Sequence, residues 1–168
     1  MIGHNVIITQ PQNVYLGDNT RIDPFTLITS KLTTGNFVQI CSHVVIGGSY
    51  NNVTLGNWTF IGYGSKLFTG SEDYSGEHGP VNEFWGSNKT YMGDITFNDY
   101  SGVASDVIVF PKITLPLGTC IGAKSLVHTK SKLEEFKVYV GNPLKFLKER
   151  NKEMVKNLSN DPNFLKIK

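Results

Sequence analysis

Cysteine, histidine and strong charge are scarce in this sequence of 168 residues. The two cysteines, Cys41 and Cys120, show neither the spacing of metal ligands nor a disulfide framework, so a reducing cytoplasm is expected. The formal net charge of +2 does not favour nucleic acid as a partner. No apolar run approaches the ~20 residues of a membrane span. Residues 1–5 lack the basic and apolar stretches of a signal peptide.

What the sequence does contain is a six-residue repeat, in three runs, in which fourteen of the fifteen repeat positions hold a large apolar residue. The repeat positions are Leu16, Ile22, Ile28, Thr34, Ile40 and Ile46, then Leu55, Ile61 and Leu67, then Phe97, Val103, Val109, Leu115, Ile121 and Val127. A period of six matches neither the 3.6-residue period of an α-helix nor the two-residue period of a half-buried strand. Small or β-branched residues follow four positions later, and Gly often follows directly, as in Ile61-Gly62 and Ile121-Gly122. These features predict the hexapeptide repeat of a parallel β-helix.

Three hexads make one triangular coil of about eighteen residues, with a short strand and a tight turn in each hexad. The apolar residue points into the prism, and Gly or Asn at the turns tolerates a positive φ. The predicted coils are 16–33, 34–54 with three extra residues, 55–72, 97–114 and 115–130. An incomplete first coil in 1–15 would contribute Val6, Ile7 and Val14 to the core. We expect one domain, with the β-helix in 1–130 and a C-terminal tail in 131–168.

Two segments depart from the repeat. Residues 70–94 are polar, Gly-rich and aromatic, and they join two coils that keep the same phase. A solenoid must extrude such an insertion sideways, and insertions of this kind often form the binding surface. Residues 143–158 carry apolar side chains at helical spacing, so a C-terminal helix is predicted there, ended by Asn160-Asp161-Pro162.

The sequence resembles the left-handed β-helix acyltransferases that carry hexapeptide repeats. The resemblance rests on the [LIV]-G-x-x-x-x hexads and on a closing signature, Pro111-Lys112-Ile113-Thr114 through Ile121-Gly122-Ala123 to Val140-Gly141-Asn142-Pro143. The segment Ser71-Glu72-Asp73-Tyr74 also looks like the branch that modifies sugars for surface polysaccharides such as lipopolysaccharide or capsule. The family implies an all-β, left-handed parallel β-helix of five to six coils, an extruded loop and a C-terminal α-helix. It also implies an acetyltransferase that acts on a sugar or nucleotide sugar.

The resemblance further implies a homotrimer, with acetyl-CoA as co-substrate in the groove between adjacent prisms and no metal. Backbone groups would bind CoA at Gly102, Ala104, Ala123 and Ser125, although many relatives carry Trp where this chain has Gly102. Residues 112–168 hold twelve of the sixteen basic side chains, which could bind an anionic ligand or coat a solvated helix face. By position in the family, the CoA phosphates would contact Lys124, Lys130, Lys145, Lys148 and Arg150.

Acyl transfer to a sugar hydroxyl needs a general base, which is most often histidine. His78 lies in the acidic loop beside Glu77, and His43 occupies an outward position of a coil. Both are candidate bases; Glu72 and Asp73 are alternatives, mainly for an amine acceptor. Tyr74, Glu77, Phe84 and Trp85 are the candidate acceptor-binding residues. Two other functions stay open: transfer to a non-sugar acceptor such as an antibiotic, and a non-catalytic β-helix scaffold.

Overall fold

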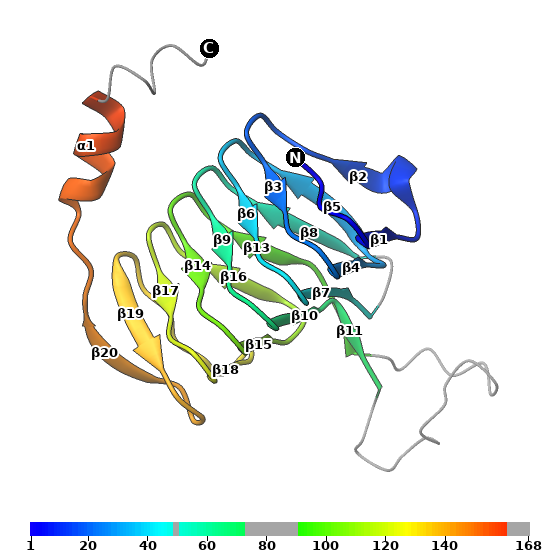
Figure 1. Ribbon diagram of the computed structural model, residues 1–168. Helices are drawn as coiled ribbons and strands as arrows, with labels where there is room; N and C mark the ends of the chain where they lie inside the picture. The colour runs from blue at the N-terminus through cyan, green and yellow to red at the C-terminus, as the bar shows by residue number, and fades with distance from the viewer. Residues whose placement is uncertain (49–50, 73–90, 161–168) are drawn as a thin grey trace.

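A computed structural model describes residues 1–48, 51–72 and 91–160, with the side chains of 159 and 160 left out. The chain winds into a triangular prism whose three walls are parallel β-sheets (Figure 1). Sheet A consists of β3 (Arg21–Ile22), β6 (Gln39–Ile40), β9 (Phe60–Ile61), β14 (Gly102–Val103), β17 (Cys120–Ile121) and β19 (Lys137–Val140), with β20 (Lys145–Glu149) antiparallel at its end. This architecture confirms the predicted left-handed parallel β-helix.

The other two walls are built in the same way. Sheet B contains β1 (Ile7–Ile8), β4 (Leu27–Ile28), β7 (Val45–Gly47), β10 (Lys66–Phe68), β15 (Ile108–Val109) and β18 (Leu126–Val127). Sheet C contains β2 (Val14–Tyr15), β5 (Lys31–Thr34), β8 (Asn52–Leu55), β13 (Ile95–Phe97) and β16 (Ile113–Leu115). A short 3-10 turn, Pro11–Asn13, precedes β2. We number the six positions of each hexad from its large apolar residue, which is the first position. The register places each first-position residue opposite its counterpart one coil away, as Ile61 lies opposite Ile40 and Val103.

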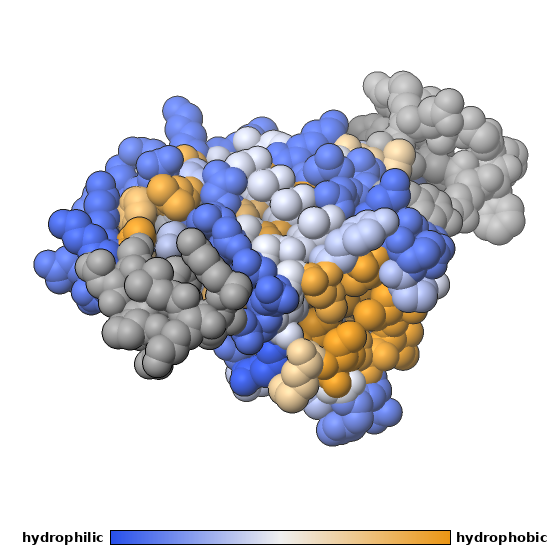
Figure 2. Space-filling model, turned by 90° about the horizontal axis from the view of Figure 1, so that it is seen from above, coloured by the Kyte–Doolittle hydropathy of each residue, from blue (hydrophilic) through white to orange (hydrophobic). Residues whose placement is uncertain are grey.

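The core is the stack of first-position residues. All of the predicted repeat positions are buried except Leu16, which is 37% exposed because it lies in the first coil, where no coil covers it on the outer side. The small residues at the fifth position, such as Thr59, Ser65 and Ser101, are buried beside the turns. The prediction for the first coil was wrong at Ile7, which is 58% exposed: strand alternation directs its neighbour Ile8 inward instead. Figure 2 shows an apolar patch over the half of the molecule that holds these first coils.

The repeat continues beyond residue 130. Leu133 and Tyr139 keep the spacing of six, Leu133 packs against the core, and β19 adds a further strand to sheet A. The predicted helix over 143–158 was wrong in its bounds. Gly141-Asn142-Pro143 instead turns the chain into a β-hairpin, and helix α1 spans Glu153–Asn160. Pairing with β20 satisfies the backbone of β19, which would otherwise be a bare sheet edge.

The insertion at 70–94 leaves the prism where it was predicted. The chain departs after Thr69 and rejoins sheet C at Ile95; β11 (Gly70–Ser71) and β12 (Tyr91–Met92) pair as its antiparallel stem. The segment with the three extra residues connects β7 of sheet B to β8 of sheet C, the same two sheets that the insertion connects. No helix in the described ranges is long and apolar enough to span a membrane.

Candidate functional site

The prism has three edges, each formed by the turns between two of its sheets. The edge formed by the turns between sheets A and B is named the A–B edge, and it contains several of the predicted site residues. Its fourth-position residues lie one above another along the prism. From the first coil onward they are Asn5, Phe25, His43, Gly64, Asp106 and Lys124, all with φ between 56° and 69°. Backbone bonds join neighbouring turns: Gly64 N–H donates to Ser42 O at 3.1 Å, and Lys124 N–H to Ser105 O at 3.0 Å. The edge is therefore a regular column.

The backbone N–H groups of third-position residues differ in their hydrogen-bond acceptors between two of the edges. Between sheets C and A, side chains of the next coil accept them: Asp18 N–H donates to Asn36 Oδ1 at 2.8 Å, and Asn57 N–H to Asp99 Oδ1 at 2.7 Å. At the A–B edge, the corresponding amides find no acceptor within the described ranges. They belong to Ser42, Tyr63, Ser105 and Ala123. The A–B edge thus presents a line of N–H donors, one per coil, to any ligand lying along it.

Several predicted residues meet on this edge. His43, Ala123 and Lys124 occupy it directly, and Lys145 lies at its end, opposite Val140 in the β19–β20 pair. Ala104 lies on the same edge, but its N–H already donates to Ile121 O at 2.8 Å. Ser105, one residue later, is the position that corresponds to Ala123. Sequence reasoning missed it because a backbone N–H carries no residue-type signal; counting hexad positions from Val103 would have found it.

His43 is exposed on the edge, two residues before β7. Its ring stacks on that of Phe25, with centroids 5.2 Å apart and planes at 22°. The next position along the edge is Gly64, which contributes no side chain. A Cβ there would meet Asp106 Oδ1 at 2.6 Å and no other part of the described chain within 4 Å except the Cγ of that carboxylate. The carboxylate of Asp106 therefore lies over Gly64, the position next to His43 along the edge.

The other predicted residues lie away from the edge or are buried beneath it. Gly102 is in sheet A under the ring of Phe60, where a Cβ would overlap that ring. Ser125 is buried, and its hydroxyl donates to Gly122 O at 2.6 Å and accepts from Gly141 N–H at 2.8 Å. Arg150 reaches the edge between sheets C and A, where its guanidinium donates to Tyr100 O and, at 3.0 Å, to Gly118 O. Lys148 is exposed on β20 opposite Val138.

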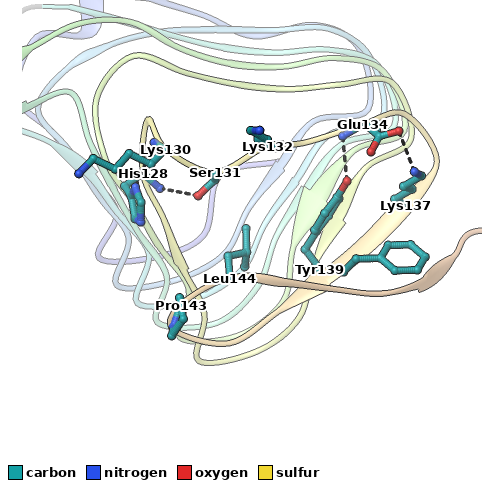
Figure 3. A pocket seen from close by; sticks show the side chains of 10 residues that line it. His128, Lys130, Ser131, Lys132, Glu134, Lys137, Tyr139, Pro143 and Leu144 are labelled. Atoms are coloured by element: carbon teal, nitrogen blue, oxygen red, sulfur yellow. Dashed lines mark hydrogen bonds and ion pairs between the residues drawn. The ribbon is translucent and has the colours of Figure 1, made fainter.

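Lys130 lies at the open C-terminal end of the prism, where a hollow of about 420 Å³ is found. Figure 3 shows Lys130 and His128 on one side and Tyr139 with Leu144 on the other. The Tyr139 hydroxyl accepts from Glu134 N–H at 3.0 Å, and Lys137 pairs with Glu134 at 2.7 Å. The hollow therefore has a basic rim that is partly neutralised.

The loop residues predicted for catalysis and acceptor binding are largely outside the described ranges: Asp73, Tyr74, Glu77, His78, Phe84 and Trp85. Glu72 lies at the loop stem, on the edge between sheets B and C, across sheet B from His43. Two contacts connect the stem region to the prism. Lys112 Nζ lies 4.6 Å from the centre of the Tyr91 ring, and Asp94 Oδ1 accepts from Asn52 N–H at 2.9 Å.

The cysteines do not resemble activated nucleophiles. Burial raises the pKa of the Cys41 thiol, and burial likewise raises the pKa of Cys120 against the opposing influence of Arg150. Within the described ranges, no group of three His, Cys, Asp or Glu side chains could hold a metal ion. The chemistry that these residues offer is therefore backbone donation along an edge, with an imidazole on the same line.

Comparisons with known proteins bear on the family and on the fold. The chain is 28% identical over 165 residues to the dTDP-4-amino-4,6-dideoxy-D-glucose acyltransferase of Escherichia coli, covering 92% of this chain and 84% of that protein. It is 31% identical over 137 residues to WcaF of Escherichia coli K12, a protein assigned to colanic acid biosynthesis as an acetyltransferase, covering 80% and 69%. No protein-family model matches the chain.

The fold also matches the crystal structure of AntD, an N-acyltransferase from Bacillus cereus, in complex with dTDP and 3-hydroxybutyryl-CoA. The TM-score is 0.80 at 25% identity, covering 98% of this chain and 88% of AntD. A hexapeptide β-helix, an edge of backbone donors and two sugar-acyltransferase relatives all lead to one conclusion. This chain belongs to the hexapeptide-repeat acyltransferases, the CoA-dependent enzymes of the left-handed β-helix fold that acylate sugars.

Proposed function

We propose that this chain transfers an acetyl or another short acyl group from acyl-CoA to the amino or hydroxyl group of a nucleotide-linked sugar, and that the reaction takes place at the A–B edge. The observation that carries this proposal is the line of unpaired amides from Ala123 to Ser42, which ends beside His43. The acceptor class is supported by the relatives, one named for a dTDP-amino sugar and one structure holding dTDP.

The pantetheine arm would lie along the edge. Its amide carbonyls are acceptors, and Ala123, Ser105 and Tyr63 supply N–H donors at intervals of one coil. At about 4.8 Å per coil, Ala123 and Ser42 are about 14 Å apart, a span that an extended pantetheine arm can cover. The phosphates would then lie near Lys124 and Lys145. This direction brings the thioester to the turn of Gly64, next to His43 along the edge.

In the reaction, the acceptor nitrogen or oxygen attacks the thioester carbonyl and the C–S bond breaks. The imidazole of His43 takes the acceptor's proton and can return it to the departing thiolate of CoA. An edge N–H, that of Tyr63 or Ser42, would stabilise the oxyanion. His78, Glu72 and Asp73 stay alternative bases.

A homotrimer in the cytoplasm is part of this proposal. The outward residues of sheet B are mostly apolar, unlike the threonines that line the outside of sheet C. They are Ile7, Leu27, Val45, Ile108 and Leu126, with Lys66 among them. Such a face favours burial against a second prism, which would place the A–B edge in a shared groove. Sedimentation at micromolar concentration is expected to give three copies; a stable monomer would exclude the shared groove.

The test of the reaction is CoA release with dTDP-4-amino-sugars and their 4-hydroxy counterparts as acceptors. His43→Asn is expected to lower kcat by about 10²–10⁴, the usual contribution of a general base. His128→Ala is the control, because it also removes an imidazole but at the end of the prism. Its kcat is expected to be unchanged. Full turnover in His43→Asn, with loss in His78→Ala, would move the base to the loop.

A further inference from the structure

Phe25 occupies the fourth position of its turn, as Phe37, Trp58 and Tyr100 do between sheets C and A. It adopts the left-handed region with φ of 62°, where a side chain with a Cβ is unfavourable and Gly or Asn is preferred. Its ring is 51% exposed, so it adds little to the core. What the ring does contact is histidine: His43 stacks on it, and the ring of His4 meets it edge-on at 5.5 Å and 82°. The three rings form one cluster along the A–B edge, in which Phe25 and His43 are stacked.

His43 has no other visible means of orientation. A histidine acting as a base is usually fixed by a hydrogen bond from one ring nitrogen to a carboxylate or carbonyl. Within the described ranges, the imidazole of His43 makes no hydrogen bond or ion pair. The nearest titratable groups along the edge are Tyr63 and Lys66 of the next turn, where Lys66 Nζ donates to Gly64 O at 3.1 Å. Beyond them lie the carboxylate of Asp106, which covers Gly64, and His4, two coils above. Stacking is thus the contact that fixes the plane of the ring.

The surroundings of Phe25 support this role. Its ring borders a hollow of about 450 Å³ at the first coils, lined by Asn5, Ile7, Thr26 and Leu27. This lining is neutral, so on its own side Phe25 is the group that contacts the imidazole. The opposite side of His43 faces Gly64, which has no side chain to stack and is covered by the carboxylate of Asp106. His43 therefore has an aromatic support on one side only.

We propose that Phe25 is a positioning residue for acyl transfer: it holds the imidazole of His43 in the plane from which a ring nitrogen reaches the acceptor's proton. The proposal rests on the proposed function, because it requires His43 to be the base. Phe25 itself does not contact the reacting atoms. Its contribution is the orientation that a carboxylate supplies in other histidine bases, here provided by an aromatic face.

The test compares Phe25→Leu, which keeps an apolar side chain without a ring face, with Phe25→Tyr, which keeps the ring. Phe25→Leu is expected to lower kcat about tenfold, with an unchanged KM for acyl-CoA, because the stack does not touch the cofactor path. Phe25→Tyr should retain wild-type kcat. Thermal melting checks that both variants fold, and His4→Ala, which removes only the outer ring, should change kcat little.

A second measurement separates positioning from a merely structural effect. Added imidazole should restore part of the turnover of His43→Ala while Phe25 is present to stack it, and should fail to do so in His43→Ala/Phe25→Leu. Wild-type kcat in Phe25→Leu, with an inactive His43→Asn, would overturn the positioning role and leave the proposed function intact. Wild-type kcat in His43→Asn would overturn the positioning role by assigning the base to another residue, whereas failure of the unaltered protein to transfer an acyl group to any of the nucleotide sugars would overturn the proposed function.

Discussion

At the scale of single residues, hexad position decides which atoms a residue offers. A third-position residue offers its backbone N–H outward, so Ala123 and Ser105 are equivalent despite different side chains. A fourth-position residue offers its side chain, so His43, Asp106 and Lys124 project from the same edge. The predictions for His43, Ala123 and Lys124 rested on hexad position or on the closing signature. All three residues lie on the A–B edge. The prediction for Ala104 lies one position away from the donor line.

Lys145 and Lys148 provide a matched pair on β20. Lys145 lies opposite Val140 at the end of the A–B edge, whereas Lys148 lies opposite Val138, away from it. Lys145→Glu is expected to raise the Kd of acyl-CoA about tenfold at low salt and less at high salt, because ions screen the lost attraction. Lys148→Glu should change the Kd little. Titration calorimetry of both variants checks this, and a larger effect in Lys148→Glu would place the phosphates elsewhere.

At the scale of elements, the C-terminal segment differs most from its sequence-based prediction. Leu144, Phe146 and Leu147 fit a helical stripe, but the open end of the prism offers unpaired backbone groups of β19 that a strand can satisfy. Tertiary pairing therefore overrides the local pattern, and the helix begins at Glu153. The sequence contains no local signal for this choice, because it depends on the coil that precedes it.

Arg150 fastens this segment to the prism, and we expect its replacement to affect stability rather than CoA binding. Its guanidinium donates to Tyr100 O and Gly118 O, and its own N–H to Phe136 O at 2.7 Å. Arg150→Ala removes the side-chain bonds and is expected to lower the free energy of unfolding by about 1–3 kcal/mol. Chemical denaturation measures the loss, with Lys148→Ala as the control on the same strand. An unchanged midpoint, together with a weakened acyl-CoA affinity, would return Arg150 to the CoA site.

At the scale of the whole molecule, the three edges of one prism serve different purposes. The edge between sheets C and A is closed by the Asp18–Asn36 and Asn57–Asp99 bonds and by Arg150. The edge between sheets B and C carries both insertions, and the A–B edge is left with free donors. The fold is predictable because every coil repeats the same spacing. The different roles of the three edges are not predictable in this way, because they depend on which side chains of successive coils contact one another.

The central claim, that acyl-CoA lies along the A–B edge, is tested most directly by removing one edge N–H with proline. Pro24 already occupies the third position of an A–B turn, so the turn geometry accepts proline there. Ala123→Pro should raise the acyl-CoA Kd about five- to tenfold for one lost hydrogen bond, while Leu117→Pro, at the same turn position between sheets C and A, should leave it unchanged. An unchanged Kd in Ala123→Pro, in a variant that melts like the parent protein, would contradict the account.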